Sequence, residues 1–270
     1  MDHAFAAAWD EGMMLASRRS WWRIAAGIQD QGARPTIPAT GSRGTGARQA
    51  PVHEATGPGQ VWSWDITDLR SPWRGKAYKA YSIIDIYSRM IVGWRVEERE
   101  ADHLAVEMFE AAFARHGRPR AVHADSGPAM RSNLLADLLE RHGIERTHNR
   151  PRVSNDNPFS ESEFRTMKYR PNYPATFQDL PAARAWVSEY VPWYNTRHRH
   201  SGIALFAPAN VHDGSWREQW ARRDQANQAY YDAHPERFHR RPQTPAPPGT
   251  VGINLTDPPQ QTAPNRLQAA

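Results

Sequence analysis

A meander of three strands is predicted from one stretch of sequence, VWSWDITDLRSPWRGKAYKAYSIIDIYSRMIVGWRV (residues 61–96). Its apolar, β-branched and aromatic residues fall into three runs, Val61–Leu69, Lys79–Tyr87 and Met90–Val96. The runs are joined by SPWRGK (residues 71–76) and by a turn at Ser88–Arg89, and such short connections are typical of antiparallel neighbours. The stretch therefore predicts the antiparallel part of a sheet.

Helical and strand-like runs alternate after this meander. The segments that follow are a helix opening at Asp102 and ending near Gly117–Pro119, a strand Arg120–Ala124, a leucine-striped helix ending at Gly143, a strand Ile144–His148 and a helix from Asn157–Pro158 to about Arg170. The order β-β-β-α-β-α-β-α predicts an α/β fold with a ribonuclease-H-like mixed sheet, in which parallel strands continue the antiparallel meander and helices flank the sheet.

The two ends of the chain differ from this middle part. A short helix is predicted over Ser20–Ile28, with Ser20 as its cap. Residues 31–59 are rich in Gly, Pro and Arg without periodicity, which indicates a flexible linker. Two further helices are expected at Leu180–Asn195 and Trp216–His234, and no structure is assigned beyond Pro242, where Pro, Gln and Thr predominate.

Charge and composition narrow the class of function. The chain has 34 Lys and Arg against 29 Asp and Glu, a formal charge of +5 that suits a polyanionic partner. The absence of cysteine excludes disulfides, thiolate zinc sites and thiol nucleophiles. Acidic residues stand where a signal peptide would be basic, and no apolar run is long enough to cross a membrane, so a cytoplasmic location without membrane partners is expected.

Three acids lie in positions that solubility does not explain. Asp65 stands inside an apolar strand, Asp125 directly follows another strand, and Glu161 lies in the first turn of a helix. Buried, clustered carboxylates repel one another, so a bound divalent cation is the natural remedy, and oxygen-only ligands favour Mg²⁺ or Mn²⁺ over zinc. Each acid alone has an ordinary structural reading, as a strand-edge charge, a turn former and a helix N-terminal acid respectively.

Several motifs in order resemble one family. They are WSWDIT at 62–67, IDIYSRMIVGW at 84–94, HADSG at 123–127, RPRVSNDNPFSESEFRTMKYRP at 150–171 and WYNTRHRHSGIALFAPANV at 193–211, with 35 residues between the second and third acids. Together they resemble the DDE transposases of bacterial insertion sequences, the branch whose core is similar to retroviral integrase. The resemblance covers most of the chain.

The resemblance implies a DNA polynucleotidyl transferase. Its expected reaction is cleavage at DNA 3′ ends followed by strand transfer during transposition, through two-metal transesterification with Mg²⁺, for which Mn²⁺ substitutes. The expected partners are the DNA of the element ends and of the target, further copies of the chain in a synaptic complex, and a separate helix-turn-helix protein. The expected location is the bacterial cytoplasm, in association with the nucleoid.

Carried over to this sequence, the three metal ligands and catalytic residues fall on Asp65, Asp125 and Glu161. Seven residues after the glutamate the family commonly has a basic residue, here Lys168, and helical spacing puts Arg165 on the same face between them. The residues expected to contact DNA are Lys168, Arg165, Asn157, Arg152, His198, Arg199 and His200. A metal role for the two histidines is the weaker reading of TRHRHS, because such residues more often contact phosphate or cap a helix.

Departures from the family pattern affect the domain assignment. Ser126 stands where the family often has Asn, and Glu163 where it often has an aromatic residue. Relatives carry a helix-turn-helix region before the core, and only Ser20–Ile28 resembles its final helix. We therefore expect residues 1–58 to be a remnant of a DNA-binding helical region plus linker, residues 59–212 the integrase-type core, and residues 213–270 a basic, partly disordered extension.

Alternatives remain open at the level of sequence. A ribonuclease-H-like nuclease would hydrolyse DNA without joining strands, and a truncated remnant would bind DNA without catalysis. Two other acids, Asp68 and Asp85, compete for a metal role. Asp68 is interpreted as solvated, because it lies on the other face of the strand from Asp65. Asp85 is interpreted as the anchor of the turn at Ser88 and Arg89. Trp62, Trp64 and Trp94 are read as core or sheet-face residues rather than as platforms for bases.

Overall fold

The computed structural model describes residues 1–28, 52–125, 127, 129–149 and 157–255. These residues form two compact units. The sheet unit contains the described residues between 52 and 197, together with residues 249–255. The helical unit contains residues 1–28 and 198–248. The units divide at residue 197, whereas the sequence predicted the core to end at residue 212; the assignment of three domains stays a prediction.

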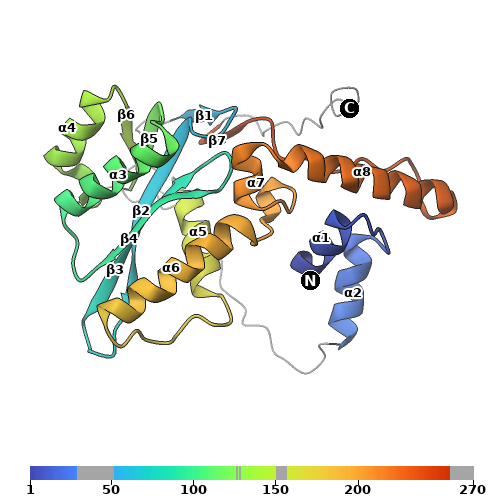
Figure 1. Cartoon of the computed structure of the whole chain (residues 1–270), viewed down its shortest axis with the longest axis horizontal. Helices are drawn as coiled ribbons and strands as arrows, with labels where there is room; N and C mark the ends of the chain where they lie inside the picture. Colours follow the sequence, from blue (N-terminus) through green and yellow to red (C-terminus); the bar gives the residue numbers. More distant parts are fainter. Residues whose placement is uncertain (29–51, 126, 128, 150–156, 256–270) are drawn as a thin grey trace, which may run out of the picture. The chain divides into compact units, whose positions relative to one another are not determined.

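A five-stranded mixed sheet forms the centre of the sheet unit (Figure 1). Its strands, in spatial order, are β4 (Ile91–Glu97), β3 (Ala77–Asp85), β2 (Val61–Arg70), β5 (Ala121–Ala124) and β6 (Glu145–His148). The first three pair antiparallel, and β5 and β6 run parallel to β2. This topology confirms the predicted ribonuclease-H-like sheet.

Helices cover both faces of the sheet, because the strands alternate two sets of apolar side chains. Trp62 and Trp64 pack in one core with α3 (Asp102–His116) and α4 (Asn133–Arg141). Leu69, at an odd position of the same strand, packs in a second core with α5 (Pro158–Lys168) and α6 (Leu180–Thr196). Both tryptophans are almost fully buried, as predicted.

A two-stranded sheet of β1 (His53–Ala55) and β7 (Val251–Ile253) was not predicted. The expected linker therefore ends before residue 53, and the prediction of no structure beyond Pro242 is wrong. A strand of three residues carries no readable periodicity, and its partner lies at the other end of the chain. The rest of the predicted linker, residues 31–51, and the tail from residue 256 lie outside the described residues.

The helical unit contains α1 (Asp2–Asp10), α2 (Arg18–Ile28), α7 (Pro208–Asp213) and α8 (Trp216–Ala233). Short 3₁₀ turns lie at Ser201–Ile203 and Pro235–Arg237 here, and at Ala129–Arg131 in the sheet unit. Helix α1 was not predicted, and α2 begins two residues before the predicted cap. No helix in the described ranges is long and apolar enough to span a bilayer.

Candidate active site

Asp65 lies in the middle of β2, where it pairs across the sheet with Ser82. Its Oδ1 accepts a hydrogen bond from the backbone N–H of Ile66 at 2.8 Å. Burial, and then repulsion from Asp125 and Glu161, raise the pKa of the Asp65 carboxyl from 3.8 to about 7. The strand thus holds an acid whose charged form is costly in the absence of a compensating cation.

Asp125 follows β5, the parallel neighbour of β2. Because Trp64 pairs with Ala124, the next residue on each strand is an acid, and Asp125 emerges beside Asp65. The Asp125 carboxylate accepts a hydrogen bond from the N–H of Gly127 at 2.8 Å, and its backbone carbonyl lies 2.8 Å from Nδ1 of His148. These bonds fix both the backbone and the side chain at the end of the strand.

Glu161 lies in the first turn of α5 and is exposed. The helix is attached to β2 by Asn157, whose Oδ1 accepts from the Ser63 hydroxyl and whose Nδ2 donates to the Trp64 carbonyl at 3.3 Å. Asn157 occupies the N-cap position as predicted, but its side chain makes these bonds instead of a capping bond. Glu161 is thereby carried on an element anchored next to Asp65.

The structure brings Asp125 and Glu161 within electrostatic reach of Asp65, since both acids raise its pKa. Among the described residues, no group of three or more His, Asp or Glu side chains is close enough together to hold a metal ion. The described residues do not include Ser126, where the sequence departs from the family pattern, or residues 150–156, which precede α5. The donor set, three carboxylates that repel one another, has the chemistry that a hard divalent cation requires. The assignment of metal ligands stays a prediction.

Lys168 and Arg165 follow Glu161 on α5. The Lys168 ammonium donates to the Thr67 hydroxyl at 2.6 Å, and Thr67 lies two residues after Asp65 on the same face of β2. Burial lowers the pKa of Lys168, an effect opposed by nearby carboxylates. Arg165 is exposed. Lys168 is therefore held beside the acids, and sequence reasoning missed Thr67, whose i+2 spacing from Asp65 was the available signal.

Glu163 is a buried acid that sequence reasoning noted only as a departure from the family. It is 2% exposed, and burial raises the pKa of its carboxyl to about 8, although Tyr190 and Ser82 lie close enough to oppose that shift. Ser82 is also the cross-strand partner of Asp65. A second protonatable carboxyl thus lies under α5.

The remaining predicted DNA contacts lie elsewhere or are not described. Arg152 lies outside the described residues. His198, Arg199 and His200 belong to the helical unit, where Arg199 pairs with Asp10 at 2.8 Å and the His200 Nδ1 accepts from the N–H of Gly202. His200 thus caps a 3₁₀ turn, one of the two roles considered for it. DNA contact by these residues stays a prediction.

The two competing acids have structural roles. Asp68 is exposed and pairs with Lys79 at 2.7 Å. Asp85 is fully buried; its carboxylate accepts from the N–H and hydroxyl of Ser88, both at 2.7 Å, and from the N–H of Gly59. The readings of Asp68 as solvated and of Asp85 as a turn anchor are confirmed.

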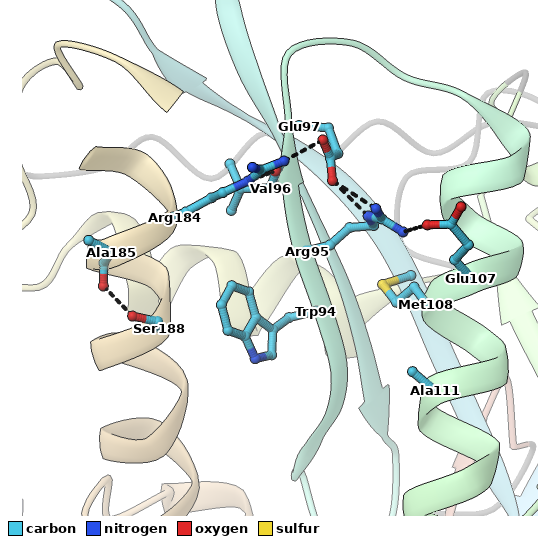
Figure 2. Close-up of a pocket in the computed structure, with 10 residues that line it drawn as sticks. All are labelled: Trp94, Arg95, Val96, Glu97, Glu107, Met108, Ala111, Arg184, Ala185 and Ser188. Atoms are coloured by element: carbon cyan, nitrogen blue, oxygen red, sulfur yellow. Dashed lines mark hydrogen bonds and ion pairs between the residues drawn. The ribbon is translucent and has the colours of Figure 1, made fainter. Parts of the chain in front are cut away.

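A hollow of about 620 Å³ lies elsewhere on the sheet unit, along the edge strand β4 between α3 and α6 (Figure 2). A chain of ion pairs crosses it, from Arg184 to Glu97, from Glu97 to Arg95 and from Arg95 to Glu107. None of the three candidate catalytic acids lines it. The hollow and the acids are separate features.

Comparison with known proteins identifies the family. The Integrase core domain family matches residues 55–154, and a second Integrase core domain family matches residues 142–208. The transposase for insertion sequence element IS904 of Lactococcus lactis is 31% identical over 160 residues, which cover 58% of this chain and 62% of the relative. Transposase InsF for insertion sequence IS3A of Escherichia coli is 33% identical over 157 residues, covering 57% of this chain and 54% of InsF. The chain thus spans a little over half the length of these relatives.

Solved structures of retroviral integrases are among those similar to the chain. They include the simian T-cell lymphotropic virus intasome in complex with a PP2A regulatory subunit, with a TM-score of 0.48, 19% identity and coverage of 61% of this chain and 58% of that one. The HTLV-2 integrase catalytic core in complex with magnesium matches with a TM-score of 0.45, 16% identity and coverage of 58% and 97%. The two integrase core matches together span residues 55–208, so the chain carries an integrase core domain and is similar to the transposases of bacterial insertion sequences.

Proposed function

We propose that this chain cleaves DNA at 3′ ends and joins them to target DNA, with Asp65, Asp125 and Glu161 as the ligands of Mg²⁺. The observation that carries the proposal is the electrostatics of Asp65. Its carboxyl is partly buried in mid-strand, and its pKa is raised to about 7 by burial and by the other two acids. Such an arrangement destabilises the protein unless a cation offsets the charge, which is typical of a functional site.

The proposed reaction is an in-line displacement at phosphorus. The oxygen of water, or of a DNA 3′-hydroxyl, forms the new bond to phosphorus, and the bond to the leaving 3′ oxygen breaks, with the proton of the nucleophile passing to solvent. Divalent cations, when bound, make the nucleophile more acidic and neutralise charge on the leaving oxygen.

The chain's own residues orient this chemistry. Asp65 lies within β2 and Asp125 directly follows β5, the parallel neighbour of β2, so pairing of the two strands sets the spacing of these acids. Asn157 joins α5 to β2, and α5 carries both Glu161 and Lys168. Lys168 is proposed to hold a phosphate next to the scissile one, with Arg165 assisting, which would add salt-sensitive affinity without reading sequence. The expected partners are element-end DNA, target DNA and further copies of this chain.

A strand-transfer assay tests the proposal. Labelled duplexes from the DNA that flanks the gene are incubated with the chain and Mg²⁺, and the products are resolved on denaturing gels. Joined strands are expected. Asp125→Asn should abolish joining and leave retardation of the duplex on native gels unchanged, whereas Asp137→Asn, the loss of an exposed acid on α4, should leave joining intact.

Each other outcome contradicts the proposal in a defined way. Nicks without joined strands would indicate a nuclease, and retardation without cleavage would indicate a DNA-binding remnant. Joining by Asp125→Asn at the rate of the unaltered chain would show that the site assignment is wrong.

A further inference from the structure

The hairpin between β2 and β3 presents an aromatic side chain to solvent. Trp73 is 65% exposed, although the loop that carries it, residues 71–76, is internally bonded. The buried Ser71 hydroxyl accepts from the N–H of Trp73 at 3.2 Å and donates to the carbonyl of Lys76 at 2.9 Å, and the Lys76 N–H donates to the Trp73 carbonyl. The tryptophan is therefore held out from the protein by an ordered turn.

Cations surround this tryptophan. Arg70, Arg74 and Lys76 are all exposed, and none of them forms an ion pair with an acid in the described part of the chain. The neighbouring Lys79 differs, because it is paired with both Asp68 and Glu100. The excess positive charge thus lies at the tip of the hairpin and not at its base.

A second exposed aromatic residue lies at the end of α5, next to Lys168. Within the described residues of the sheet unit, the large apolar side chains that are exposed are Val52, Trp73, Leu134 and Tyr169. The two aromatic ones each adjoin cations: Trp73 adjoins Arg74, and Tyr169, which is 61% exposed, follows Lys168. Since Lys168 bonds to Thr67 of β2, the end of α5 lies against the strand that leads into the hairpin.

A hollow of about 750 Å³ lies beside the hairpin. Its lining includes Trp73, Tyr78 and Arg99, together with Lys79 and the two acids with which Lys79 pairs. Pockets of this size accept small-molecule groups such as a nucleobase with its sugar. Aromatic and polar side chains in one lining offer both a stacking surface and hydrogen-bonding partners.

The length of β2 sets the distance between the hairpin and the candidate catalytic acids. Asp65 and Arg70 are both in β2, five residues apart, which at about 3.3 Å per residue corresponds to about 17 Å. A stacked DNA strand advances about 3.4 Å per nucleotide and an unstacked strand advances further, so the hairpin begins at most about five nucleotides from the reacting phosphate. Lys168, which lies within electrostatic reach of both Asp65 and Arg70, bridges the interval.

We propose that the hairpin Arg70–Lys76 binds unpaired nucleotides of the DNA strand that enters the active site, with one base stacked on the Trp73 indole and the adjacent phosphates held by Arg70, Arg74 and Lys76. This inference rests on the proposed function and deepens it by naming a second contact with the same strand. Aromatic faces and cations side by side are the chemistry by which proteins hold single-stranded nucleic acid without reading its sequence.

The experiment compares variants of the full chain on a short single-stranded oligonucleotide and on its duplex, without Mg²⁺ so that no cleavage occurs. Stacking of one base supplies about 1–3 kcal/mol, so Trp73→Ala should weaken single-strand binding by about 5- to 150-fold. Trp73→Phe should retain most of the affinity. Leu134→Ala, the loss of another exposed apolar side chain, 50% exposed on α4, is the matched control and should change nothing.

Two further readouts locate the contact. The pair Arg74→Gln and Lys76→Gln should reduce the slope of log affinity against log salt by about 1.4, since each phosphate contact on a single strand contributes about 0.7. When 2-aminopurine is placed at one position at a time along the oligonucleotide end that is cleaved, its fluorescence quenching on binding should peak within about five nucleotides of the scissile phosphate. That peak should disappear in Trp73→Ala.

The outcomes separate this inference from the proposed function. If the unaltered chain cleaves and joins DNA in Mg²⁺ but Trp73→Ala binds the single strand as tightly as Leu134→Ala does, the inference is wrong and the function stands. If the unaltered chain binds neither oligonucleotide, both fail. If Trp73→Ala changes the sedimentation of the protein and not its DNA affinity, the hairpin contacts protein and the inference is overturned.

Discussion

Replacing Asp65 by asparagine is expected to stabilise the metal-free protein while abolishing its activity. Burial and the two neighbouring acids raise the pKa of Asp65 from 3.8 to about 7, so the native state binds this proton more tightly than the unfolded chain does. The free energy of unfolding therefore falls as pH rises through the window from 3.8 to about 7, and the loss is complete above it. Asparagine has the same shape and can accept the same bond from Ile66, but it carries no charge.

The size of the effect follows from the two pKa values. Their difference corresponds to about 4 kcal/mol at 1.36 kcal/mol for each pH unit, and partial exposure of the carboxylate reduces the expected gain to about 2–3 kcal/mol at pH 8. At pH 5 the Asp65 carboxyl is protonated in the folded protein, so the gain should fall to less than half. Asp65→Asn should thus be stabilising at high pH and much less so at low pH.

Urea unfolding followed by circular dichroism, in EDTA at pH 5 and pH 8, measures this gain. Asp68→Asn is the matched control on the same strand, and loss of its exposed ion pair with Lys79 should cost less than about 1 kcal/mol at either pH. Added Mg²⁺ should stabilise the unaltered chain and not Asp65→Asn, because a ligand that binds only the native state raises its stability. An Asp65→Asn protein that is no more stable in EDTA at pH 8, or equally stabilised at both pH values, would refute the reasoning.

Three further predictions concern residues outside the candidate site. Arg223→Met should destabilise the helical unit by about 3–5 kcal/mol in thermal unfolding. Arg223 is fully buried and hydrogen-bonded to the carboxylate of Asp10, which would lose this partner. An unchanged melting temperature would contradict this prediction. Asn195→Ala should lower the free energy of unfolding by about 2–4 kcal/mol and speed amide hydrogen exchange at Ile91. The Asn195 side-chain amide accepts from the N–H of Ile91 and donates to the carbonyl of Ile91, both at 2.9 Å. Unaltered exchange at Ile91 would argue against this role. Acidification from pH 6.5 to about 4 should destabilise the helical unit. Burial and a neighbouring histidine lower the pKa of His198 to about 4, so the unfolded chain binds this proton at a higher pH than the folded protein does. His198→Gln should reduce the pH dependence of the unfolding free energy measured by chemical denaturation.

The sequence by itself determined the strands of the five-stranded sheet, the helices that flank it and their order. Hydrophobic period and turn residues are local properties, so the strands at residues 61–69 and 90–96 and the helix after Asn157 were predictable to within a residue or two. The candidate acids were also identifiable, since Asp65 interrupts an apolar strand and Asp125 follows another. Family motifs then fixed the likeness to integrase-type transposases.

Tertiary structure alone decided the features that depend on residues distant in sequence. The pairing of β1 with β7 joins the two ends of the sheet unit, and neither three-residue strand has a period to read. The side chain of Asn157 bonds to β2 instead of capping its own helix, which depends on where α5 docks. The connection at residues 71–76 places Trp73 outside a strand, but its 65% exposure is set by the elements that surround the turn and not by residue type.

The electrostatics of the site belongs to the same category. The raised pKa of Asp65 arises from desolvation and from acids 60 and 96 positions away in the chain, which folding brings within reach. Sequence specifies which groups ionise, whereas the energy of ionisation depends on distance and dielectric environment, and both exist only once the chain has folded.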